Sequence, residues 1–260
     1  YNGGTGNDVV LSYDQSPVIN ADDYAAGDSL ITVELVGANI VAKIGATTIL
    51  NTPLANLTSL TINGQTGDDT LSIDFTGGNP IPSGGLFFNG DTSVPNGDTL
   101  TVIGGNFTNI VTTFANANDG TINFDGSVVQ YTGLEPVLLN VGSVQNIIFN
   151  LPGGGTDDNA ILEDDGVPTN DTSRLRSQNA MPTFETTTFT NPSNSLTVNM
   201  GMSSGMFTID ALDAGFSAKN PDVAVNGQAG DDTITLNART GTGTYMIDGG
   251  GGINDTLIGT

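Results

Sequence analysis

The chain has 260 residues, a formal net charge of −23 at pH 7, and no Cys, His or Trp. Without Cys and His it has no disulfides, thiol nucleophiles, zinc-thiolate sites or histidine general bases. With only 5 Lys and Arg against 28 Asp and Glu, neither nucleic acid nor an anionic membrane surface is expected as a partner. Membrane insertion is not expected either, because no apolar run approaches the roughly 20 residues of a spanning helix.

Short β-branched and aromatic runs, separated by Gly, Asn, Asp and Pro, recur along the chain and are typical of strands. No segment has the period of an amphipathic helix, so no helix is expected. Residues 31–50 predict a hairpin or meander, because Gly-containing breaks separate their apolar runs. In chain order, strands are expected at 30–36, 40–44, 86–88, 110–114, 121–124, 128–131, 137–139, 144–149, 196–200, 206–209 and 245–247.

Residues 158–182 have a different composition. They contain the acidic run Glu163-Asp164-Asp165 and two of the three arginines of the chain, Arg174 and Arg176. The acidic residues lack the alternating spacing of an EF-hand calcium loop. We therefore expect a long protruding loop over 158–182, within one elongated domain that covers residues 1–260.

A Gly-rich turn followed by Asp recurs between the expected strands. The clearest copies are 64–73 (GQTGDDTLSI) and 227–236 (GQAGDDTITL). Further, less regular copies lie at 3–11, 96–102, 154–161 and 250–258. Each copy predicts a strand, a tight turn, an Asp that accepts N–H groups of the turn, and a second strand.

The two ends of the chain resemble each other. Residues 1–10 align with 247–257 if one residue is inserted. This match predicts that the chain is part of a longer tandem-repeat protein, whereas a chance alignment of two Gly-Asn-Asp turns is the alternative.

Residues 3–11 (GGTGNDVVL) fit the whole G-G-x-G-x-D-x-U-x nonapeptide and so resemble the RTX, or haemolysin-type, calcium-binding repeats. The copies at Gly64 and Gly227 replace the second glycine by Gln, and the copy at Gly250 replaces the third by Ile253. The motif aspartates also lie too far apart for a compact calcium roll, so a solenoid with longer turns is expected.

Two further phrases, residues 61–69 and 129–136, resemble very large secreted repeat proteins of bacteria, particularly planctomycete-type surface proteins. This resemblance implies a secreted β-solenoid surface protein and no particular chemistry.

Calcium is the cofactor that the RTX resemblance implies. Carboxylates stacked about 4.8 Å apart on successive solenoid turns would repel each other, and Ca²⁺ is a hard cation that binds such oxygens. The alternative is that each Asp caps its turn without metal. The candidate calcium ligands are Asp8, Asp68, Asp69, Asp231, Asp232 and Asp255.

No catalytic residue is predicted, and the chain is not expected to be an enzyme. β-Helices do host polysaccharide lyases and hydrolases, so a polysaccharide-acting enzyme is an alternative. A groove in which clustered acids meet Lys219 or Arg239 would favour it.

The sequence thus predicts an all-β fold, most simply a right-handed parallel β-helix or β-solenoid with hairpin excursions; tandem β-sandwich domains are the alternative. The expected function is structural: a segment of a secreted or cell-surface bacterial protein, such as a filament, stalk or adhesin. A calcium-binding module without an assembly role is a further alternative. Expected partners are other copies bound end to end, other surface proteins, or polysaccharide.

Overall fold

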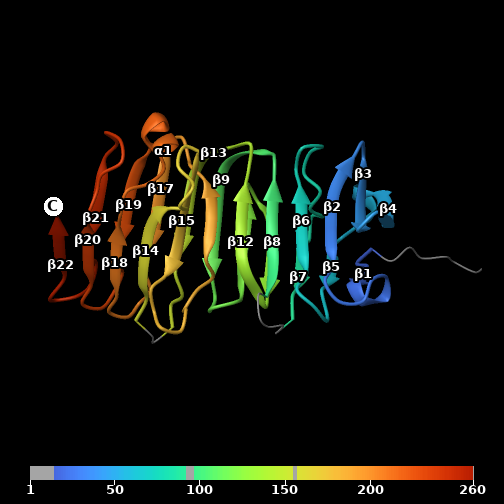
Figure 1. Ribbon diagram of the computed structural model, residues 1–260, viewed down its shortest axis with the longest axis horizontal. Helices are drawn as coiled ribbons and strands as arrows, with labels where there is room; N and C mark the ends of the chain where they lie inside the picture. The colour runs from blue at the N-terminus through green and yellow to red at the C-terminus, as the bar shows by residue number, and fades with distance from the viewer. Residues whose placement is uncertain (1–14, 92–96, 155–156, 260) are drawn as a thin grey trace, which may run out of the picture.

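The computed structural model describes residues 15–91, 97–154 and 157–259. These residues form a long rod in which strands lie side by side across the long axis, with the C-terminus at one end (Figure 1). The strands belong to two sheets, sheet A with ten strands and sheet B with twelve. The predicted all-β fold is confirmed, and each strand expected between residues 30 and 247 from its apolar run overlaps an observed one, whereas the motif copy at 3–11 lies outside the described residues.

Sheet A contains, in spatial order, β1 (Val18–Asn20), β5 (Leu60–Asn63), β7 (Leu86–Asn89), β11 (Ser127–Thr132), β10 (Gly120–Phe124), β9 (Asn106–Phe114), β13 (Ser143–Asn150), β17 (Ser195–Asn199), β19 (Asp222–Asn226) and β21 (Tyr245–Asp248). Sheet B contains β22 (Thr256–Gly259), β20 (Thr233–Leu236), β18 (Met206–Ile209), β14 (Asn159–Asp164), β15 (Thr172–Ser177), β16 (Thr187–Thr190), β12 (Leu134–Asn140), β8 (Asp98–Ile103), β6 (Thr70–Asp74), β2 (Leu30–Val36), β3 (Asn39–Ile44) and β4 (Thr47–Pro53).

Each regular turn of the chain gives one strand to sheet A and the next strand to sheet B. In sheet A, β5 pairs in parallel with β1 and β7. In sheet B, β6 pairs in parallel with β2 and β8. This alternation is the parallel β-solenoid that the sequence predicts.

Antiparallel excursions interrupt the regular turns at three places. At the N-terminal end, β2, β3 and β4 form the meander expected over residues 31–50. In sheet A, β9, β10 and β11 form a second meander, in which β11 returns to pair in parallel with β7. In sheet B, β14, β15 and β16 repeat this arrangement, and β16 returns to β12.

The expectation of a protruding loop over 158–182 is therefore wrong. This segment contains β14 and β15, which pair with each other within sheet B. Glu163 of β14 accepts hydrogen bonds from Arg174 and Arg176 of β15, each at 2.6 Å. The charges that suggested a loop are cross-strand partners, which stabilise an antiparallel pair.

The core lies between the two sheets, where inward side chains of successive turns stack in columns. The parallel register places Ile19, Ile62, Phe88 and Tyr131 in one such column of sheet A. All four side chains are buried. Because parallel neighbours lie about 4.8 Å apart, each side chain packs on the equivalent side chain of the adjacent turn, and the core runs along the rod.

One short helix was not expected. It is α1 (Ala214–Lys219), which begins where Asp213 accepts the Gly215 N–H and ends at Asn220 in the left-handed region. Six residues are too few to give a periodic sequence signal. Two single-turn 3₁₀ helices, η1 (Ala21–Asp23) and η2 (Leu54–Asn56), also occur. In the described part of the chain, no helix is long and apolar enough to span a membrane.

Candidate functional site

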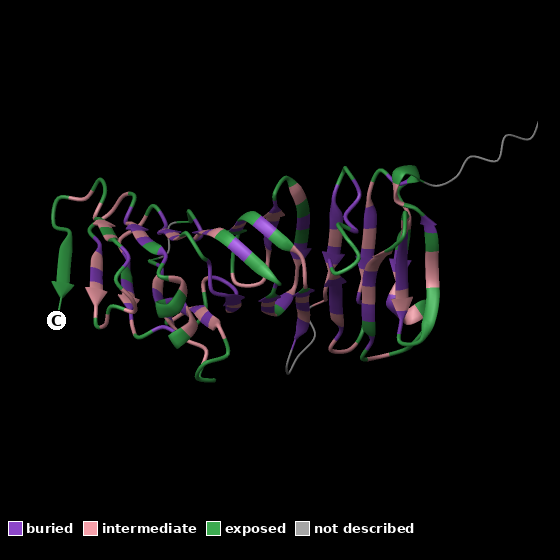
Figure 2. Ribbon diagram, turned by 90° about the horizontal axis from the view of Figure 1, so that it is seen from above, coloured by how far each residue is buried: buried purple, intermediate pink, exposed green. Residues whose placement is uncertain are grey.

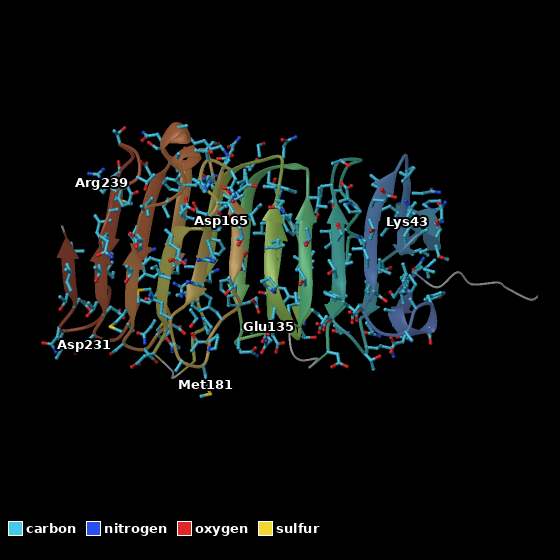
Figure 3. The ribbon with its side chains drawn as sticks, in the orientation of Figure 1. Lys43, Glu135, Asp165, Met181, Asp231 and Arg239 are labelled. Atoms are coloured by element: carbon cyan, nitrogen blue, oxygen red, sulfur yellow. The ribbon has the colours of Figure 1, made fainter. Side chains whose placement is uncertain are left out.

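The aspartates of the Gly-Asp motif lie at one kind of corner, where the chain leaves sheet A and enters sheet B. Asp69 directly precedes β6, Asp232 precedes β20, and Asp255 precedes β22. Asp231, at one of these corners, lies along the lower edge of the rod in Figure 3. The structure thus places the motif copies on one long edge; Asp8 lies outside the described residues.

Corner aspartates are joined to the preceding turn by backbone hydrogen bonds. Oδ1 of Asp69 accepts the N–H of Ser29 at 2.7 Å. Oδ1 of Asp98, one turn further on, accepts the N–H of Asp69 at 2.6 Å, and its Oδ2 accepts the N–H of Asp91 at 2.6 Å. Each carboxylate therefore binds an N–H of the adjacent turn at the place where a parallel ladder would otherwise leave a donor unpaired.

The same connection recurs near the C-terminal end of the rod. Oδ1 of Asp232 accepts the N–H of Gly205 at 2.8 Å, and Oδ1 of Asp255 accepts the N–H of Asp232 at 3.0 Å. We call these connections the aspartate corner ladder.

The second oxygen of each inner aspartate lies against a glycine of its own turn. A Cβ on Gly64 would lie 2.6 Å from Oδ2 of Asp69, and a Cβ on Gly227 would lie 2.6 Å from Oδ2 of Asp232. Both Oδ2 atoms are buried and make no hydrogen bond with any described residue. Glycine at this motif position thus allows the carboxylate to lie within the turn, where a side chain would collide with it.

The Gln residues that replace the second motif glycine adopt a glycine-like backbone. The φ angles are 75° at Gln65 and 73° at Gln228. The turn geometry of the motif is therefore kept in both copies, at the strain of a non-glycine residue with positive φ.

The paired aspartates of each motif have different environments. Burial raises the pKa of Asp69 to about 6 and raises that of Asp232. Asp231 is exposed, and the side chain of Asn254, followed by the N–H groups of Ile253 and Asn254, lowers its pKa. In the copy at 227–236 the adjacent carboxylates therefore do not act as a pair: Asp232 is buried within its corner, and Asp231 binds the neighbouring turn from outside.

The predicted calcium sites stay a prediction. Among residues 15–91, 97–154 and 157–259, no group of three or more acidic side chains could hold a metal ion. Backbone N–H groups can offset the repulsion expected between stacked carboxylates without a metal ion. The N–H of Asp69 donates to Asp98, and the N–H of Asp232 donates to Asp255.

A second side-chain ladder, which was not predicted from the sequence, lies at the ends of the sheet A strands. The amide of Asn63 donates to Asn20 at 2.8 Å, and the amide of Asn89 donates to Asn63 at 2.7 Å. Further along, Asn199 donates to Asn150 and Asn226 donates to Asn199, both at 2.7 Å. The sequence signal is an Asn that follows the last apolar residue of each strand.

Two adjacent hollows lie beside the corners near the middle of the rod, and both are lined by Ala117 and Pro182. The first, of about 390 Å³, also contains Asp158. The second, of about 420 Å³, contains Glu135 and Glu185. Glu185 was not predicted as a site residue; it stands among Phe and Thr in a segment of strand-like composition.

Glu185 is buried, and burial raises its pKa to about 8. Burial, and to a smaller extent the charge of Glu185, raise the pKa of Tyr131, whose hydroxyl has no hydrogen-bond partner in the part of the chain that the structure describes. A protonated Glu185 at neutral pH removes one charge from this part of the core.

The five basic side chains are bound elsewhere. Lys43 pairs with Glu34, and Lys219 pairs with Asp171. Arg174 and Arg176 pair with Glu163. Arg239 donates to the carbonyl of Gly243 and lies over the ring of Tyr245.

Neither Lys219 nor Arg239 lines the hollows that contain Asp158 and Glu185. The combination of acids and cations that would favour a polysaccharide-acting enzyme is therefore not assembled there. No protein family, curated protein or solved structure matches the chain.

Proposed function

We propose that the chain is a structural segment of a secreted or cell-surface bacterial protein, a rigid rod used as part of a filament, stalk or adhesin. The observation that supports it is a stack of turns that side chains join along the axis. Core columns run along the rod, and the aspartate corner ladder and the asparagine ladder join successive turns in its N-terminal and C-terminal stretches. Such a stack resists bending because each interaction is repeated along the axis.

Exposed edge strands lie at the C-terminal end of the rod. β21 and β22 are the edge strands of the two sheets, and Figure 2 shows β22 exposed along its length. Leu257 continues the column of Ile234 but remains 62% exposed, and Ile258 beside it is 47% exposed. An edge strand with exposed apolar side chains is a template for a further strand pair.

The partner at this end is another solenoid turn of the same kind, contributed by a second copy bound end to end. This contact would continue both sheets and cover Leu257. The absence of Cys suits an extracellular protein whose extended core supplies stability without disulfides.

The test is end-to-end assembly. We expect sedimentation velocity and electron microscopy of the wild-type chain to show concentration-dependent growth in length at constant width. The double variant Leu257→Lys, Ile258→Lys should abolish that growth, because charged edge strands do not pair. A matched control is Val167→Lys, which changes a 56% exposed residue away from the end. Lateral clustering, or a wild-type chain that stays single at the highest concentration, would contradict the proposal.

A further inference from the structure

Asp158 occupies a corner at which the aspartate corner ladder is broken. It directly precedes β14, as Asp69 precedes β6. β14 pairs in parallel with β18 on one side, but on the side of the preceding turn its neighbour is β15, which is antiparallel and belongs to the excursion. The parallel turn that would supply a corner N–H is therefore missing beside Asp158.

As a result, Asp158 is buried without the hydrogen bonds of its counterparts. The residue is 3% exposed, and within residues 15–91, 97–154 and 157–259 neither of its buried carboxylate oxygens has a hydrogen-bond partner. Burial raises the pKa of Asp158, and the nearby Thr183 hydroxyl, which is itself buried without a well-formed hydrogen bond, lowers it to a smaller extent. A buried carboxylate without a donor is costly, so this position favours a ligand that supplies one.

The neighbouring amide that could have bound Asp158 is used by the backbone. The side chain of Asn179 donates to the carbonyl of Asp157 at 2.7 Å and accepts the N–H of Asn159 at 2.8 Å. Local hydrogen bonds thus hold the loop after β15 in place and leave the Asp158 carboxylate unpaired.

Asp158 lines the first of the two hollows, which we call the Asp158 hollow. Its walls are largely aliphatic: Ala115, Ala117, Pro152, Met181 and Pro182 contribute to them. Met181 is 83% exposed at the rim. Figure 3 shows Met181 and Glu135 on the same long edge of the rod. The walls can therefore cover an aliphatic stem, and the carboxylate of Asp158 belongs to the lining that a polar head group would meet.

The charge around the hollow has no internal counterion. Glu135 and Glu185 line the adjacent hollow. None of the five Lys and Arg side chains, all of which lie in the described ranges, lines either hollow. A positively charged ligand is therefore favoured both by the unpaired carboxylate and by the net charge of the chain, −23.

We propose that the Asp158 hollow binds an organic cation, in which an ammonium or guanidinium group donates hydrogen bonds to Asp158 and an aliphatic stem lies against Pro152, Met181 and Pro182. A bare metal ion fits less well, because a calcium ion takes six to eight oxygens and the lining of this hollow includes one carboxylate. A guanidinium group matches a carboxylate with two parallel hydrogen bonds.

The experiment is an NMR titration of the full chain with agmatine and with n-butylammonium, using 1-butanol as the uncharged control. We expect saturable binding of a cation, with shifts centred on residues 115–117 and 181–183, and no saturable binding of 1-butanol. Asp158→Asn should weaken binding at least tenfold. Asp232→Asn, at an equivalent corner outside the hollow, should leave it unchanged. Thermal unfolding of each variant establishes that it is folded.

A second variant keeps the test independent of any change in the buried corner. Ala117→Lys places a cation at the wall of the hollow and should block agmatine without altering Asp158. A Gly-Arg-Gly peptide tests whether the cation can be a side chain of a partner polypeptide as well as a free small molecule. Binding of this peptide, like binding of agmatine, supports the proposal. The proposal is overturned if no cation binds saturably or if Asp158→Asn binds the cations as the wild type does. It is also overturned if calcium binds at Asp158 without displacing agmatine.

Discussion

The backbone N–H of Asp69 donates to Oδ1 of Asp98 at 2.6 Å, so that one motif aspartate binds the backbone of another. Asp98 is buried, and its other oxygen accepts the N–H of Asp91. The Gly-Asp motif therefore has a role in joining solenoid turns that needs only the atoms of the chain.

Removing this carboxylate should destabilise the rod. Asp98→Ala leaves two N–H groups without their acceptor, and each buried unsatisfied donor costs about 1–3 kcal/mol. We expect a loss of about 2–4 kcal/mol in the free energy of unfolding, measured by urea denaturation. Asp74→Ala removes one hydrogen bond within its own turn and serves as the control, with a loss below about 1 kcal/mol. Equal losses in both variants would contradict a special role for the corner.

The close approach of glycine to aspartate can be tested by adding one methyl group. Gly64→Ala would place Cβ 2.6 Å from Oδ2 of Asp69, whereas Gly153→Ala meets nothing within 4 Å. We expect Gly64→Ala to cost about 1–3 kcal/mol and Gly153→Ala to be nearly neutral, as measured by thermal and urea unfolding. In the double variant with Asp69→Ala, the clash should disappear. The loss of unfolding free energy in the double variant should therefore be smaller than the sum of the losses in the two single variants.

The asparagine ladder should also contribute to stability. Asn63→Ala removes one accepted and one donated amide hydrogen bond, to Asn89 and Asn20. We expect a cost of about 1–2 kcal/mol in the free energy of unfolding. Asn51→Ala removes a single exposed contact with Asn39 and should cost less than half as much. A ladder without energetic value would give two indistinguishable variants.

Stability should rise as the pH falls from 8 towards 5. Burial raises the pKa of Glu185 from 4.5 to about 8 and that of Asp69 from 3.8 to about 6. A carboxyl with a higher pKa in the folded chain binds its proton more tightly there, so the folded state loses stability as the pH rises from the unfolded value to the folded one. The Glu185 contribution is roughly 2–4 kcal/mol between about pH 4.5 and 8.

Two variants separate this contribution from general charge repulsion. Glu185→Gln should flatten the dependence of the melting temperature on pH between 6 and 8. Asp231→Asn removes one negative charge at a residue whose pKa is lowered, and it should leave that slope in place. A Glu185→Gln chain with the wild-type slope would contradict a buried, protonated Glu185.

Much of the fold could be predicted from the sequence, because its signals are local. Gly, Asn and Asp separate runs such as 86–88 and 206–209, and both became strands. The pairing of β14 with β15 could not be predicted, because Glu163 and Arg174 are partners only once an antiparallel register is known.

The same reason explains the features of the corners that were missed. The sequence shows Asp158 as one more Gly-Asp corner, but its lack of a donor depends on β15 lying beside β14. The asparagine ladder was visible as a repeated strand-ending Asn, but its meaning requires the parallel register that brings Asn63 beside Asn20.

The most direct test of metal-free corners is thermal unfolding followed by circular dichroism, in excess EDTA, in millimolar calcium and in millimolar magnesium. Because Oδ1 of Asp69 and of Asp232 binds a backbone N–H and Oδ2 lies buried against glycine, we expect the same melting temperature in all three. A calcium site occupied at 100 times its Kd would add about 2.7 kcal/mol to the free energy of unfolding. A rise in melting temperature with calcium that magnesium does not reproduce would contradict metal-free corners and make the motif aspartates calcium ligands.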